Sequence, residues 1–259
     1  PQAGVAPTPV TALLHAVAVV KAGAFAFIRL TYYMFGAKFL SGTWAQSAVM
    51  GIVIVTILYG CSRAVKETHL KRRLAYSTIS NLSYILFGVT IMTPAGLVGA
   101  LCHLVFHAVI KICAFFCAGA VIHQTKKEYV WQLNGMGRKL PLVFGAFTVS
   151  SLALMGVPGR GGVRSKWHLA AAAASGGSPM MHAGVGALLI SALLTATYML
   201  TIVVRAFFTE SEDPKIETYH DPRWQMLAPI AVFVVAMLIF GLYSGLLVDF
   251  FGQVAGGSL

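Results

Sequence analysis

The sequence predicts an all-α polytopic membrane protein with about eight transmembrane elements. Hydrophobic residues make up 58% of the 259 residues, charged residues only 10%, and the mean hydropathy is +0.78. A soluble domain carries roughly 25% charged residues and about 45–50% apolar ones, so this chain cannot present the usual water-compatible surface. Its apolar runs also reach or exceed the ~20 residues that cross the hydrocarbon core of a bilayer.

Charged, glycine-containing or proline-containing stretches separate the hydrophobic runs and set the boundaries of the elements. The basic connections 63–73 and 125–139 end the second and fourth runs, and the acidic loop 209–223 separates the last two. The predicted elements are residues 10–35, 44–62, 74–92, 95–122, 141–157, 163–174, 182–208 and 225–250.

The stretch 141–174 is interrupted by glycine and proline. At 1.5 Å per residue it is too long for one straight crossing of the membrane. The sequence Gly-Val-Pro-Gly-Arg-Gly-Gly at 156–162 therefore separates two helical pieces. A phosphate-binding loop is rejected here, because Gly156 and Gly161 are followed by Gly162 and Val163 instead of Lys and Ser. We expect a discontinuous membrane helix, whose freed backbone groups line a cavity and whose ends carry partial charges.

The formal net charge of +11 lies mostly in short connections between the runs. Charge beside a membrane span reports topology and contact with lipid headgroups, and no basic stripe with interleaved aromatics indicates nucleic-acid binding. The Lys and Arg residues of 63–73 and 124–140 predict that these loops face the cytoplasm. Five of the eight acids lie in 209–223, so the interiors of the spans contain essentially no carboxylate, and Asp249 lies near the end of the last span.

The cysteines are expected to be small core residues. They lie in or at the ends of apolar runs, at Cys61, Cys102, Cys113 and Cys117. Cys113 and Cys117 share a helix face, but a metal site would need more ligands than these two. The sequence therefore predicts no disulfide framework, no metal and no cofactor.

Three lysines interrupt apolar runs, at Lys21, Lys111 and Lys166. Ionisable groups within a membrane are costly and usually face a bundle interior or a water-filled path. The alternative is a side chain that snorkels to the interface. About ten apolar residues lie on either side of Lys21 and Lys111, which argues against snorkelling; the alternative stays more open for Lys166, close to a break and to two arginines.

His103, His107 and Lys111 are spaced by four residues and so share one helix face. Histidine titrates near neutrality, and burial disfavours the charged form of an amine. The row therefore predicts a proton relay. Two histidines at this spacing could also bind a metal, but no carboxylate or cysteine is placed on that face to complete such a site.

Four segments of the chain together resemble the antiporter-like subunits of respiratory complex I, Mrp-type cation/proton antiporters and membrane-bound hydrogenases. They occur in the order in which that family has them. The segments are TPVTALLHAVAVVKAGAFAFIRL (8–30), LKRRLAYSTISNLSYILFGV (70–89), HLVFHAVIKICAFFCAGAVIH (103–123) and LALMGVPGRGGVRSKW (152–167).

The resemblance implies an inverted-repeat antiporter-like fold, with a broken helix in each repeat and lysines that move protons at mid-membrane. Residues 10–62 would end the first repeat, 70–208 would form the second, and 225–250 would be a C-terminal helix. Lys21 matches the lysine of the first broken helix, Lys111 the central lysine, and Lys166 the lysine of the second broken helix. Family members are about twice as long, and their modulating glutamate would lie upstream of Pro1, in an N-terminal half that this chain is expected to lack.

The break departs from the family pattern Gly-x-Pro-Pro-x-x-Gly-Phe. Gly159 replaces the second proline and Val163 the phenylalanine, while Arg160 and Arg164 occupy positions that are usually apolar or small. Two added cations beside Lys166 would raise the cost of protonating it.

The predicted function is translocation of H⁺ or Na⁺ by a non-redox membrane subunit, either NADH:quinone oxidoreductase-like or of a cation/proton antiporter. Its expected partners are other membrane subunits and the lipid bilayer, in a bacterial or archaeal plasma membrane or an organellar inner membrane. Lys21, His103, His107, Lys111 and Lys166 are the expected proton-handling residues. The alternatives are a structural membrane subunit that has lost transport, or a solute carrier with a binding site at the broken helix.

Overall fold

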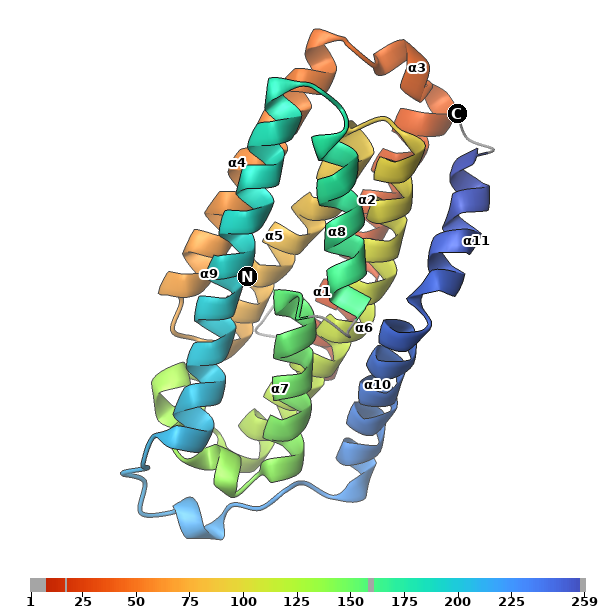
Figure 1. Cartoon of the computed structure of the whole chain (residues 1–259). Helices are drawn as coiled ribbons and strands as arrows, with labels where there is room; N and C mark the ends of the chain where they lie inside the picture. Colours follow the sequence, from red (N-terminus) through yellow and green to blue (C-terminus); the bar gives the residue numbers. More distant parts are fainter. Residues whose placement is uncertain (1–7, 17, 158–160, 257–259) are drawn as a thin grey trace.

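The computed structural model describes residues 8–16, 18–157 and 161–256, and in these the chain forms a bundle of helices (Figure 1). The described residues contain no strand, only an isolated bridge between His69 and Tyr129. The helices are α1 (Thr8–Ala16), α2 (Val19–Arg29), α3 (Ala37–Leu40), α4 (Trp44–Lys66), α5 (Leu70–Thr90), α6 (Pro94–Thr125), α7 (Pro141–Met155), α8 (Gly161–Ala174), α9 (Pro179–Phe208), α10 (Trp224–Leu242) and α11 (Ser244–Gly256).

Five stretches of the described chain are long and apolar enough to cross a membrane, which confirms the predicted fold class. They are Val10–Met34, Trp44–Lys66, Pro94–Thr125, Pro179–Phe208 and Trp224–Leu242. Large apolar side chains are exposed along the outer faces of these helices, as a lipid-facing surface requires. Exposed Trp44 and Trp224 stand at the start of α4 and α10, at opposite ends of the bundle, where indoles mark the two membrane interfaces (Figure 1).

Helix α5 is missing from that set because its sequence is polar, with three cations in its first turn and many hydroxyl side chains after them. Most of α5 is nevertheless buried, packed between α4 and α6. Its approach to α6 is close: a Cβ atom added to Gly96 would lie 2.7 Å from the carbonyl oxygen of Gly88. The polar side chains of α5 therefore face protein and not lipid.

The predicted break between α7 and α8 is present, and α7 ends where the glycine allows it to end. Gly156 takes a left-handed conformation with φ +97°, and the N–H groups of Gly156 and Val157 both donate to the carbonyl of Leu152. The predicted elements 141–157 and 163–174 correspond to Pro141–Met155 and Gly161–Ala174. Gly159 and Arg160 lie outside the described residues, as does the side chain of Val163.

Two further interruptions divide elements that the hydropathy pattern predicts as continuous. The segment 10–35 is divided between Ala16 and Val19, shortly before Lys21. The segment 225–250 is divided at Tyr243 into α10 and α11, so that Asp249 lies within α11 and not at the end of a span. Figure 1 shows that the α10–α11 junction and the end of α7 both lie about halfway up the bundle.

Residues 126–140 and 209–223 gather at one end of the bundle, called here the loop end. Lys127 forms an ion pair with Asp213, and Lys139 with Glu217 at 2.5 Å. The hydrogen bond from Lys127 holds the pKa of the Asp213 carboxyl below its usual range. Asp221 accepts hydrogen bonds from the N–H groups of Leu142 and Val143, a favourable place for a carboxylate at the start of α7.

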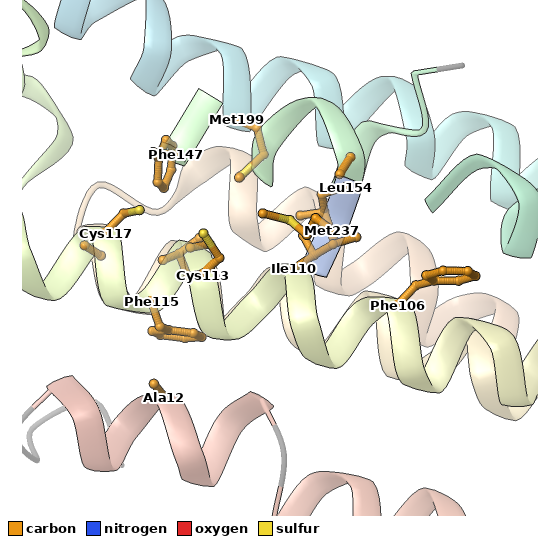
Figure 2. Close-up of a cluster of buried hydrophobic side chains, with 14 of the residues drawn as sticks. Ala12, Phe106, Ile110, Cys113, Phe115, Cys117, Phe147, Leu154, Met199 and Met237 are labelled. Atoms are coloured by element: carbon orange, nitrogen blue, oxygen red, sulfur yellow. The ribbon is translucent and has the colours of Figure 1, made fainter. Parts of the chain in front are cut away.

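The apolar core surrounds α6. Figure 2 shows Cys113 and Cys117 on the side of α6 that faces Phe147 and Met199, while Phe115 points toward Ala12 of α1. These residues are buried, as the sequence predicts for Cys113 and Cys117. Cys61 is also buried, but its surroundings are polar: its sulfur lies 2.9 Å from the hydroxyl of Ser80 and 2.8 Å from that of Ser191.

Candidate functional site

The helix α6 carries His103, His107 and Lys111 along one buried face, as their spacing predicts. His103 is 3% exposed, and His107 and Lys111 are fully buried. The two imidazole rings stack with their centroids 5.9 Å apart. Three titratable groups are thus in register inside the protein, at the centre of a helix that is otherwise apolar.

The Nζ atom of Lys21 lies 2.8 Å from Nδ1 of His107, although 86 residues separate the two in the chain. The interruption between α1 and α2 brings the lysine here, because Lys21 is in the first turn of α2 and its side chain is buried. In this contact either the lysine or the imidazole donates, depending on which of them holds the proton. The pair can therefore exchange a proton without a large movement.

His103 continues the row toward α8. Its Nδ1 atom lies 3.0 Å from the hydroxyl of Ser165, which is fully buried and precedes Lys166 in the sequence. The Tyr84 ring of α5 lies beside His103, with ring centroids 5.3 Å apart. The order of contacts is Lys21, His107, His103 and Ser165, so the two broken helices are connected through α6.

The break in the second discontinuous helix holds Lys166. Its Nζ atom donates to the carbonyl oxygen of Leu154 at 2.6 Å and lies 5.2 Å from the centroid of the Tyr84 ring. The Leu154 carbonyl belongs to the last turn of α7, whose oxygens have no partner within the helix and carry partial negative charge. The freed backbone therefore stabilises the ammonium, and the tyrosine ring adds a cation–π contact.

Lys111 lies one turn beyond His107 on α6, and its Nζ atom donates to the carbonyl oxygen of Leu74 at 3.1 Å. The hydroxyl of Thr78 donates to the same oxygen at 3.0 Å. Among the described residues, the hydrogen bond of the Lys111 amine is thus to α5, whereas His107 bonds Lys21.

Among the described residues, three buried polar atoms near the row have no protein partner: Nε2 of His103, Nε2 of His107 and Oδ1 of Asn81. Helices α5 and α6 are antiparallel, with Leu74 opposite Lys111 and Tyr84 opposite His103. This register places Asn81 opposite the stretch between the two histidines. Buried polar atoms of this kind are normally satisfied by ordered water, so the layer has the chemistry of an internal hydration site.

The contributions of Ser165, Tyr84 and Asn81 were not among the sequence predictions. The one signal in the sequence was the polarity of α5, which is unusual for a membrane helix. A second hydroxyl-lined layer involves α4, α5 and α9, where Ser77 and Tyr198 lie 2.6 Å apart near the group formed by Cys61, Ser80 and Ser191.

Arg164 does not lie beside Lys166 as a competing cation. The two residues are two positions apart and so point to nearly opposite sides of α8. Arg164 is exposed, and its guanidinium approaches Gly245 of α11. The expectation that two added cations raise the cost of protonating Lys166 stays a prediction, because Arg164 points away from Lys166 and Arg160 lies outside the described residues.

Comparison with known proteins identifies the family of the chain. Residues 1–195 match the transmembrane family of NADH:quinone oxidoreductase and Mrp antiporters. The chain is 32% identical over 247 residues to NADH-quinone oxidoreductase subunit L of Rickettsia typhi, covering 93% of this chain and 36% of the relative. It is also 32% identical over 250 residues to subunit N of Desulforudis audaxviator, covering 92% of this chain and 49% of the relative.

Solved structures share the fold. The Mrp complex from Dietzia sp. has a chain that matches with a TM-score of 0.86 and 24% identity over 99% of this chain and 54% of that one. An archaeal membrane-bound sulfane sulfur reductase matches with a TM-score of 0.87 and 22% identity, over 98% of this chain and 50% of that one. The chain thus spans about half the length of these structures and about a third to a half of the two relatives above. It is an integral membrane protein that belongs to the transmembrane family of NADH:quinone oxidoreductase and Mrp antiporter subunits.

Proposed function

We propose that the chain moves protons across the membrane through Lys21, His107, His103, Lys111 and Lys166, as part of a multisubunit complex. The contact of 2.8 Å between Nζ of Lys21 and Nδ1 of His107 carries this proposal. It joins a lysine beside one helix break to a histidine row that reaches Ser165, next to the lysine of the other break. Purely structural packing does not require two such titratable groups to share a buried contact.

The steps of the relay follow from the contacts. A proton passes between the amine of Lys21 and the ring of His107, and then along the stacked histidines to the α8 side. There Lys166 accepts it, and the ammonium that forms donates to the Leu154 carbonyl. The two ring centroids lie 5.9 Å apart. Water bound at Nε2 of both histidines and at Asn81 would connect the two rings by hydrogen bonds. A charge on one lysine disfavours a charge on the next, which couples successive transfers.

The loop end is proposed to face the cytoplasm of a bacterial or archaeal cell. Support comes from the basic residues of 63–73 and 124–140, because α4, α5, α6 and α7 begin or end at that end of the bundle (Figure 1). The division into repeats at 62–70 stays a prediction, supported by a broken helix with a lysine after the break on each side of it. H⁺ is proposed over Na⁺ because the row contains histidines and no carboxylate.

The test is His107→Met in the full subunit within its complex, with proton uptake by inverted membrane vesicles followed by a pH-sensitive dye. We expect proton uptake to be lost while the complex still assembles, because methionine keeps the apolar volume and removes the titratable ring. His182→Met is the matched control, since His182 is exposed on α9 and bonds only the Ser178 carbonyl of its own helix end. Undiminished uptake in His107→Met would favour the alternative of a structural subunit that has lost transport.

A further inference from the structure

The outer surface at the start of α8 and in α11 carries two charged side chains that the proton row does not use. Arg164 is exposed on α8, and Asp249 is exposed on α11. They lie near each other, because an added Cβ atom at Gly245 would be 3.9 Å from Nη1 of Arg164, and Asp249 is one helical turn beyond Gly245 on the same face. The two side chains form no ion pair with each other within the described part of the chain.

Both charges lie at a depth that lipid headgroups do not reach. Helix α7 has 15 residues and α8 has 14, so at 1.5 Å per residue about 22 Å of helix precedes the break and about 21 Å follows it. The break is therefore close to the bilayer centre, with the headgroups about 15 Å away on either side. Arg164 is only three residues past the start of α8, and Asp249 five past the start of α11.

Lipid tails are a poor surrounding for these side chains. Exposed charges at the bilayer centre are costly unless another polar group meets them. Lys166, by contrast, is satisfied by the Leu154 carbonyl and the Tyr84 ring. Trp167, 71% exposed, follows Arg164 by three residues on the neighbouring part of the α8 surface. Arginine and tryptophan are the residue types that most often dominate the binding energy of interfaces.

We propose that Arg164, Trp167 and Asp249 form a docking surface for a transmembrane helix of a neighbouring subunit. Charge complementarity defines that helix: it carries a carboxylate opposite Arg164 and a hydrogen-bond donor about one turn further along, opposite Asp249. This surface lies on the outside of the bundle and does not depend on the proton row. The arginine at the helix break is then a contact residue and not part of the relay.

The experiment places the photoreactive residue p-benzoylphenylalanine at Leu246 of the full subunit in its native complex. Leu193 of α9 is the matched control position, because both leucines are 71% exposed. After irradiation, we expect Leu246 to yield a cross-linked peptide from another subunit whose membrane span contains Asp or Glu. Leu193 should yield lipid adducts.

A charge variant then links the cross-link to Arg164. Arg164→Gln should lower the yield at position 246 by at least about tenfold, because the partner carboxylate is left unpaired. Arg164→Lys should retain most of it, and Lys38→Gln, at an exposed cation outside this surface, should leave it unchanged. If Arg164→Gln fails to accumulate in the membrane, Asp249→Asn takes its place, with the same loss expected.

Four results would overturn the proposal. They are lipid adducts alone at position 246, a cross-link to a second copy or to another segment of the same subunit, a partner span without a carboxylate, and a yield that the charge variants do not change.

Discussion

The hydrogen bond between His103 and Ser165 offers a sharp test of the relay, because one atom can be removed from it. Ser165→Ala deletes the hydroxyl that lies 3.0 Å from Nδ1 of His103. Ser165 is fully buried and His103 is 3% exposed, so bulk water cannot replace the lost group freely. Since Nε2 of His103 has no protein partner among the described residues, the ring would then have no side-chain partner at either nitrogen.

A buried polar group that loses its partner costs about 1–3 kcal/mol. We assign that cost to the barrier for proton transfer between the histidine row and α8. Each addition of about 1.4 kcal/mol to a barrier slows the step tenfold, so the proton flux should fall roughly 5-fold to 150-fold. The measurement is proton uptake by inverted vesicles, divided by the turnover of the parent complex in the same preparation.

Ser150→Ala is the matched control for this variant. Ser150 is also fully buried, but its hydroxyl donates to the Ala146 carbonyl within its own helix and lies beside Cys113, which is on the other side of α6 from the row. Ser165→Thr keeps a hydroxyl and should keep most of the flux. The reasoning would be refuted if Ser165→Ala pumped as well as Ser150→Ala, or if Ser165→Thr were as impaired as Ser165→Ala.

Three other predictions follow from contacts described above. Lys111→Ala should abolish proton uptake while a native gel still shows the assembled complex, because it removes the third titratable group of the buried α6 face that carries His103 and His107; normal uptake would contradict its role. Gly96→Ala should destabilise the detergent-solubilised protein by about 1–3 kcal/mol, because the new Cβ would lie 2.7 Å from the Gly88 oxygen; an unchanged melting temperature would show that the helices can separate at no cost. The pKa of Asp213 is depressed, so its ion pair with Lys127 should stabilise residues 209–223 at neutral pH and be lost only as pH falls through the lowered pKa; hydrogen exchange should then show protection that is constant from pH 8 to about 5, and loss near neutrality would contradict this.

Much of the fold could be predicted from the sequence, because length and hydropathy decide which segments can cross a bilayer. The α7–α8 break was predictable for the same reason, because the run 141–174 is too long for one crossing of the membrane. Gly156 and the proline that follows it mark where the helix ends. The α10–α11 break was not, because no proline lies next to Tyr243 and the run remains predominantly apolar on both sides of it.

The arrangement of the candidate site was predictable only where its residues share one helix, although Lys21 and Lys166 could be singled out because they interrupt apolar runs. The spacing of His103, His107 and Lys111 gives their common face directly. The contact of Lys21 with His107 joins residues 86 positions apart and depends on how two helices pack, which no local pattern contains. The positions of Ser165 and Asn81 beside the row were not predicted, because hydroxyl and amide side chains are common in helices that have no function.

The polarity of α5 has a consequence for biogenesis. A segment that begins with Lys71, Arg72 and Arg73 and continues with serines and an asparagine is unfavourable as a single helix entering lipid from the translocon. Only three residues connect it to α4, with which it packs closely along its length. We therefore expect α4 and α5 to leave the translocon together as a hairpin. The two helices would then pack against each other before they are released into the bilayer.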